Sequence, residues 1–204
     1  MSLLSPLRAF VDQLTYPART HPWKFSIIFT SAKTGLADYL TQTQLEKCET
    51  FDYRRNAVFW VFGAWFLGGF QYAAYVHGFT RMFPAAARFT ILPPREKLKD
   101  YAGQRAVVGQ VTFDMLIFEP FIYFPCFYQT KGWLNGQTPL EAHGSWRKNV
   151  VEDVVAFWSV GIPAFTFNFA FCPLWMRVPF VGVYSLFWTT YLSYKRGKAD
   201  APTP

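Results

Sequence analysis

Nine polar or charged side chains lie inside long apolar stretches of this chain, where such residues are rare and usually paired or functional. They are Lys33, Thr34, Asp38, Gln42, Gln110, Asp114, Glu119, Asn168 and Arg177. The ionisable members of this set carry two positive and three negative charges, a sum of −1. If all of them are paired, they form the hydrogen-bonded core of a helical bundle. If some stay open, they line a weakly cation-preferring pathway across a membrane, and the sequence leaves both interpretations open.

Spacing places several of these residues on shared helix faces. Thr34, Asp38 and Gln42 recur every four residues, so they form one stripe along a helix. Gln110 and Asp114 are also four residues apart and share a face of a later helix. We expect these two stripes to face each other, either satisfying each other or enclosing water. On this hypothesis a carboxylate in either stripe would influence which ions pass.

Arg177 is the one arginine deep in the C-terminal apolar region. An unpaired charge at membrane depth costs on the order of 3 kcal/mol or more. We therefore expect its guanidinium to pair with a carboxylate, from Asp114, Glu119 or Asp38. The alternative is an interfacial arginine whose head reaches lipid phosphates.

The composition indicates an integral membrane protein. Of the 204 residues, 51% are hydrophobic and 21% aromatic, while only 16% are charged. A soluble domain typically has about 25% charged residues. The long apolar stretches do not alternate polar and apolar residues, so they read as helices in lipid and not as half-buried strands.

We expect an all-α bundle with four spans. The first three are predicted at 23–42, 56–77 and 106–128. The last is a proline-broken helical unit over 157–196, made of two apolar runs that are separated by Pro173 and Arg177. Trp and Tyr near the ends of the runs are typical of membrane interfaces.

Three segments make up the predicted domain organisation. Residues 1–22 form an amphipathic helix at the membrane interface, ended by Pro17. Residues 23–196 form a single transmembrane helical domain. Residues 197–204 are a polar tail.

Basic residues suggest how the chain is oriented in its membrane. The net charge is +7, and segment 78–105 holds six Lys and Arg residues, against three in each of the other flanking segments. The positive-inside rule then favours the N-terminus, segment 78–105 and the C-terminus on one side. Because the basic residues flank apolar runs, we expect anionic lipid headgroups as partners and do not expect nucleic acid.

Several short motifs resemble those of the Mpv-seventeen family, which includes the twenty-two-kilodalton peroxisomal membrane protein. They are Asn168-Phe169, Pro173-Leu174, Arg177 and the run 187–193 near the C-terminus, Asp38 with Gln42 in the first span, and Asp52 with Arg54-Arg55 before the second. The resemblance implies a four-span helical protein of the mitochondrial inner membrane or, alternatively, the peroxisomal membrane. It also implies pore-like conductance or solute exchange.

Two functions follow as hypotheses. The first is small-solute flux through a channel or carrier, with a role in membrane homeostasis. The alternative is a structural or accessory subunit of a larger organellar membrane complex, or a homo-oligomer, without transport activity. The family's Gly-Pro-x-x-His is Gly68-Gly69-Phe70-Gln71-Tyr72 here, and this departure favours the alternative. We expect no enzymatic activity, cofactor or metal, because phosphate-loop, HExxH and GxSxG motifs are absent and the three cysteines lack metal-ligand spacing.

Overall fold

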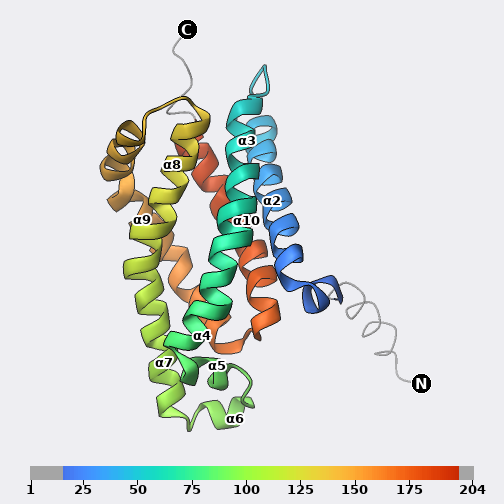
Figure 1. Cartoon of the computed structure of the whole chain (residues 1–204), viewed down its shortest axis with the longest axis vertical. Coiled ribbons are helices and arrows are strands. Elements are labelled where there is room, and N and C mark those ends of the chain that lie inside the picture. Colours follow the sequence, from blue (N-terminus) through green and yellow to red (C-terminus); the bar gives the residue numbers. More distant parts are fainter. Residues whose placement is uncertain (1–15, 198–204) are drawn as a thin grey trace, which may run out of the picture.

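The computed structural model describes residues 16–197, whose regular elements are all helices. In this part of the chain, five long helical segments run alternately in opposite directions along the molecule (Figure 1). They are α2–η1 (Pro22–Leu40, Thr41–Leu45), α3–η2–η3–α4 (Tyr53–Phe62, Gly63–Gln71, Ala74–Gly78, Phe79–Met82), α7–η4–α8 (Tyr101–Phe113, Asp114–Tyr123, Phe124–Leu134), α9 (Pro139–Phe171) and α10 (Leu174–Gly197). Two short helices, α5 (Pro84–Thr90) and α6 (Pro94–Lys97), lie at one end.

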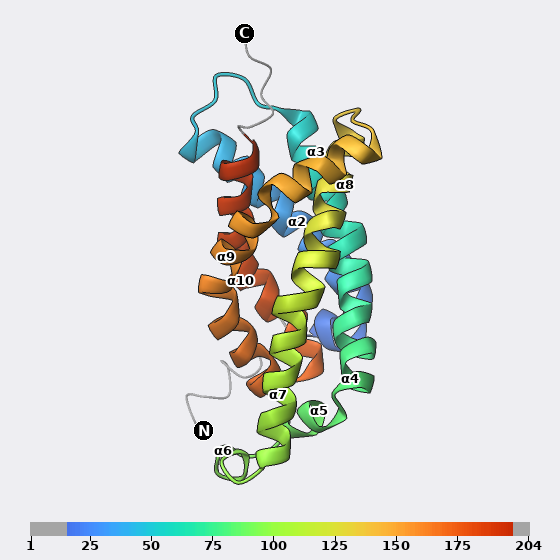
Figure 2. The same ribbon diagram turned by 90° about the vertical axis from the view of Figure 1, so that its left-hand side faces the viewer.

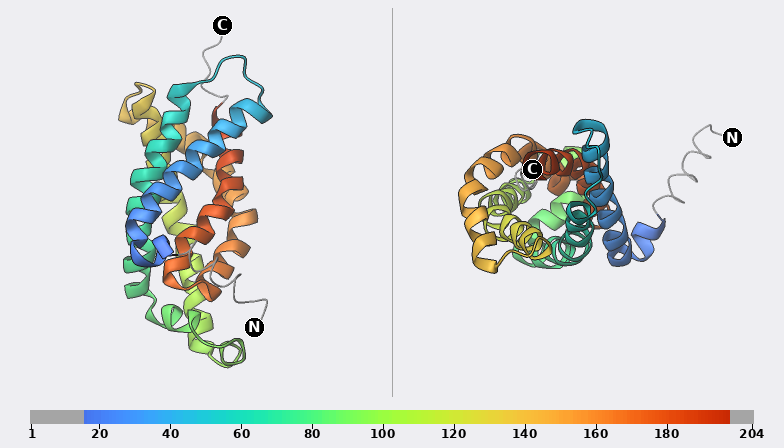
Figure 3. Two further views of the ribbon diagram at one scale, coloured as in Figure 1. Left: turned by 90° about the vertical axis from the view of Figure 1, so that its right-hand side faces the viewer. Right: turned by 90° about the horizontal axis from the view of Figure 1, so that it is seen from above.

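The helical membrane-protein class is confirmed. Among the described residues, three helices are long and apolar enough to cross a membrane: Tyr53–Met82, Tyr101–Leu134 and Pro139–Phe171. Helices α2 and α10 run beside them along the bundle, as Figures 2 and 3 show. The structure therefore does not confirm the predicted four spans. Most of the predicted N-terminal interfacial helix, residues 1–15, and the tail from residue 198 lie outside the described residues.

The C-terminal unit differs from the prediction in its course. The chain does break at Pro173, but α9 and α10 are two antiparallel helices joined there, and Arg177 lies within α10. The 24 residues of α10 rise about 36 Å, enough to return along the bundle. Helix α10 therefore ends at the opposite end from α5 and α6 (Figure 1), whereas the sequence predicted the C-terminus on the side of segment 78–105.

Side chains at the helix starts determine where the segments begin. Asp52 and Asp100 each accept a backbone N–H in the first turn of α3 and α7. Thr138 and Glu141 form a reciprocal capping box at the start of α9. Before it, the chain turns at Gly136 with φ of +73°, a conformation that favours glycine.

The core is built mainly of aromatic rings from four of the long segments. Phe62 and Phe66 stack with their centroids 4.9 Å apart, and Tyr123 meets Phe62 edge-on at 5.4 Å. Phe157 of α9 meets Trp188 of α10 edge-on at 5.0 Å. Edge-on and offset pairs of this kind add stability beyond their buried area.

Wider π-helical turns occur in the second and third long segments. They form η2 and η3 in the second segment and η4 in the third. Buried Gln71 and Tyr75 belong to the first pair, and buried Asp114 and Glu119 belong to η4. Such turns are rare and are often found at functional sites.

Two glycines allow α2 to pack closely against η2. A methyl group built on Gly68 would lie 2.4 Å from Cα of Ile27, and one on Gly63 would lie 2.1 Å from the Thr34 hydroxyl. The Thr30 hydroxyl donates a hydrogen bond to the Gly63 carbonyl at 2.6 Å. Small residues at helix contacts are a common basis of packing in membranes.

Gly68→Ala is expected to destabilise the bundle. Overpacking of a tight contact costs about 1–3 kcal/mol, which outweighs the gain of up to about 1 kcal/mol in helix propensity. Gly69→Ala is the matched control, because its new methyl group would come no closer than 3.6 Å to the Ala64 carbonyl oxygen. Thermal unfolding of both variants in detergent checks this, and an equal rise in Tm for the two would contradict the close packing.

Candidate functional site

A charged cluster joins the end of α2 to α3 and α10. Asp38 is fully buried and forms an ion pair with Arg55, 3.0 Å from Nε. It also accepts hydrogen bonds from the side-chain amides of Gln42 and Asn56, both at 2.9 Å, and from the hydroxyl of Ser193. These four partners come from three elements: Gln42 from η1, Arg55 and Asn56 from α3, and Ser193 from α10. We call this group, together with Glu46, the Asp38 cluster.

Arg55 also has partners other than Asp38. Its guanidinium binds Glu46 at 2.7 Å and the Ser193 carbonyl at 2.9 Å. Gln42 completes the cluster by accepting the backbone N–H of Asp52 at 2.7 Å. The carboxylates and the guanidinium are thus mutually paired, which favours an architectural role for Asp38 and Gln42 over the lining of a pathway.

Asp114 and Glu119 form a second buried group in the middle of the bundle. Each is at most 1% exposed, and Tyr75 lies between them. The Tyr75 hydroxyl oxygen is 2.9 Å from Asp114 Oδ1 and 3.4 Å from Glu119 Oε1, and Gln71 donates to it at 3.1 Å. We call Asp114 and Glu119 the acid pair.

The acid pair needs more hydrogens than Tyr75 supplies. A phenol has one O–H and can donate to only one carboxyl group. Among the described residues, no Lys or Arg forms an ion pair with either acid, and Glu119 Oε2 is buried without a partner. The contact therefore requires a further proton or a cation.

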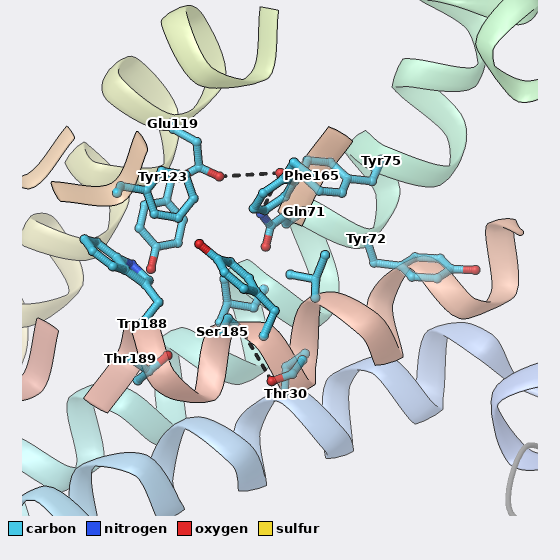
Figure 4. A pocket seen from close by; sticks show the side chains of 15 residues that line it. Thr30, Gln71, Tyr72, Tyr75, Glu119, Tyr123, Phe165, Ser185, Trp188 and Thr189 are labelled. Carbon is cyan, nitrogen blue, oxygen red and sulfur yellow. Dashed lines mark hydrogen bonds between the residues drawn. The ribbon is translucent and has the colours of Figure 1, made fainter. Parts of the chain in front are cut away.

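A cavity of about 30 Å³ lies beside Glu119 and Tyr75 (Figure 4). One water molecule needs roughly 10–15 Å³ of cavity volume, so this cavity has room for about two water molecules. Its walls are largely aromatic, with Tyr123, Phe165 and Trp188 among them. The cavity is therefore water-sized.

Lys33 contacts two residues of the cavity wall, Ser185 and Thr189. Its ammonium donates to the hydroxyls of Ser185 at 2.8 Å and Thr189 at 3.2 Å. Both hydroxyl residues line the cavity, across from Glu119 in Figure 4. The cavity thus has a carboxyl group on one wall and a lysine behind the other.

The two sequence-predicted stripes do not face each other. The α2 stripe meets α3 and α10: Thr34 donates to the Phe59 carbonyl at 2.7 Å, and Asp38 accepts from Ser193. Asp114 instead meets Tyr75 of the second segment. Gln110 is buried one turn before Asp114, with its amide nitrogen unpaired.

The last two predicted residues lie elsewhere. Asn168 is fully buried on α9, and neither side-chain amide atom has a partner. Arg177 is 1% exposed and donates to the Thr90 hydroxyl at 3.3 Å, with its guanidinium over the Phe169 ring. Among the described residues it forms no ion pair with a carboxylate, so the prediction of pairing with Asp114, Glu119 or Asp38 is wrong.

Sequence reasoning missed the actual partners of both stripes, although a spacing signal was present. Ser185, Thr189 and Ser193 recur every four residues in the last apolar run and form the face of α10 that meets α2. Gln71 and Tyr75 show the same spacing in the second segment. Small hydroxyl and amide residues in an apolar run thus mark helix faces as clearly as charges do.

The arrangement can hold water, protons or a small cation. A carboxylate oxygen without a partner beside a water-sized cavity attracts positive charge, and hydroxyls and a phenol can relay protons. Among the described residues, no group of three or more His, Cys, Asp and Glu side chains is placed to hold a metal ion.

Comparison with known proteins supports the resemblance. The model of the Mpv17 / PMP22 family matches residues 132–193. The chain is 25% identical to the mitochondrial inner membrane protein Mpv17 of Danio rerio over 87% of this chain and 92% of that protein. It is 28% identical to Protein SYM1 of Eremothecium gossypii over 90% of this chain and 93% of that one, and 27% identical to Protein SYM1 of Debaryomyces hansenii over 82% and 79%. No solved structure matches the chain.

Proposed function

Because the chain belongs to the Mpv17 / PMP22 family and is a protein of an organelle membrane, we propose that it passes small cations across that membrane. The mitochondrial inner membrane is the proposed location, since relatives of similar length carry that location in their names. The peroxisomal membrane is the alternative.

One observation carries the proposal. A carboxylate oxygen of Glu119 is buried without a partner at the wall of a cavity inside the bundle. The Tyr184 hydroxyl lines the same cavity and is also unpaired. Buried polar atoms nearly always have a hydrogen-bond partner, so these atoms are sites for water or for a passing ion.

The polar groups continue from the cavity toward one end of the bundle. Lys33, Thr189 and Ser193 follow one another along the α2–α10 contact up to the Asp38 cluster. Toward the other end, the acid pair is covered by aromatic rings, with Phe79 and Phe169 packed at 4.9 and 5.5 Å from the Tyr75 ring. On this proposal, passage requires these rings to move aside.

Planar-bilayer recording of the purified protein tests this function. We expect discrete current steps that are absent from bilayers treated with protein-free detergent. The accessory-subunit hypothesis makes the opposite prediction. A silent bilayer, combined with comigration of the chain with a large complex on a native gel of organelle membranes, would replace the transport proposal with that role.

A further inference from the structure

Two positive charges are buried at the α5–α6 end of the bundle without an acidic partner. Arg177 is 1% exposed and Lys97 is 7% exposed. Among the described residues, neither forms an ion pair, whereas Arg55 at the other end has two carboxylates. Buried charge is costly when it is left uncompensated, so these two cations lack a negative partner.

Both cations converge on the last residue of α5. The Lys97 ammonium donates to the Thr90 carbonyl at 3.0 Å and to the Ala170 carbonyl, and Arg177 donates to the Thr90 hydroxyl at 3.3 Å. The Lys97 ammonium also lies 4.5 Å from the centroid of the Phe171 ring. Burial lowers the pKa of the Lys97 ammonium below its usual value.

One hydrogen-bonding group of this pair is unused. Arg177 Nε is buried without a partner. Burial raises the pKa of the Cys172 thiol, and the charges of Arg177 and then Lys97 oppose that rise. The two cations therefore act on the same point, at the turn between α9 and α10.

We propose that Lys97 and Arg177 form a binding site for a phosphate group, supplied by an anionic phospholipid headgroup or by a soluble phosphate compound. A guanidinium and an ammonium are the donors that proteins use most for phosphate oxygens. Exposed basic residues on the same segment attract anions to this end; they are Arg81, Arg88, Arg95, Lys99 and Arg105. Lys97 lies on α6, a helix of only four residues, so displacement of one short element opens the site.

The test is thermal unfolding of the full chain after removal of co-purified lipid. Three additions are compared: inorganic phosphate, vesicles that contain phosphatidylglycerol, and vesicles of phosphatidylcholine alone, with sodium chloride matching the ionic strength. At ten times its Kd, a bound anion should raise the Tm of the wild-type protein by about 3–6 °C. A rise with phosphate identifies a soluble compound as the source, and a rise with phosphatidylglycerol alone identifies a headgroup.

Lys97→Met should lose this rise and, without any anion, should be at least as stable as the wild type, since an uncompensated buried charge is gone. Lys99→Met is the matched control, because it removes the same charge two residues away from an exposed position. Arg177→Gln with Arg95→Gln as its control repeats the comparison at the second cation. Equal responses of Lys97→Met and Lys99→Met, or no response of the wild type to either anion, would overturn the site.

Discussion

Arg55→Gln is expected to lower the Tm of this protein by roughly 10 °C, the largest loss of stability that one substitution outside the aromatic core should cause. Arg55 pairs with both Asp38 and Glu46, whose side chains are at most 1% exposed. Its removal leaves two buried carboxylates without a counter-charge. Breaking a buried pair in this way costs about 3–5 kcal/mol, and thermal unfolding in detergent measures the loss.

The adjacent arginine and a second-site change serve as controls. Arg54 is exposed and, within residues 16–197, its side chain donates to the Leu134 carbonyl and to no carboxylate, so Arg54→Gln should change Tm far less. Adding Asp38→Asn to Arg55→Gln removes one of the stranded charges and should recover part of the stability. If the double variant is no more stable than Arg55→Gln, charge compensation is not what holds the Asp38 cluster together.

The second large effect concerns Glu119. Glu119→Gln removes from the cavity wall a carboxyl group that can carry a negative charge when a cation binds, and it keeps the shape of the side chain, so potassium efflux from protein-containing vesicles should slow at least tenfold. Coulomb attraction between unit charges 4 Å apart reaches about 4 kcal/mol near a protein surface, and tenfold corresponds to only about 1.4 kcal/mol. A potassium-sensitive dye measures the efflux.

Lys33→Met supplies a control of opposite sign. It removes the positive charge behind the Ser185 and Thr189 wall, so potassium efflux should become faster. A general disturbance of packing would change potassium efflux in the same direction for both variants. If Glu119→Gln and Lys33→Met slow efflux equally, electrostatics at the cavity is not the cause.

The sequence predicted the class of fold and the existence of polar helix faces, but not which faces meet. A four-residue spacing places Asp38 and Gln42 on one side of α2, yet the order of helices around the bundle decides the partner. That order brings α10 against α2 and the second segment against η4. Neither arrangement can be read from local spacing, because it depends on contacts between residues more than 30 positions apart.

Two further differences have identifiable physical causes. Arg177 was expected to need a carboxylate, but the Thr90 hydroxyl and the Phe169 ring surround it instead. The four-span prediction counts the two C-terminal apolar runs as one broken unit. In the structure, the turn at Pro173 makes them a helical hairpin. A proline marks where a helix stops, and the direction of the next helix is set by its packing.

The zero-current potential under a potassium chloride gradient tests most directly whether the acid pair lines a path for cations. With purified wild-type protein in a planar bilayer and a tenfold gradient, the zero-current potential should shift toward the equilibrium potential of potassium. The shift of this potential should be smaller for Glu119→Gln and larger for Lys33→Met. A wild-type potential at zero or toward the chloride value, or identical potentials for all three proteins, would contradict the account.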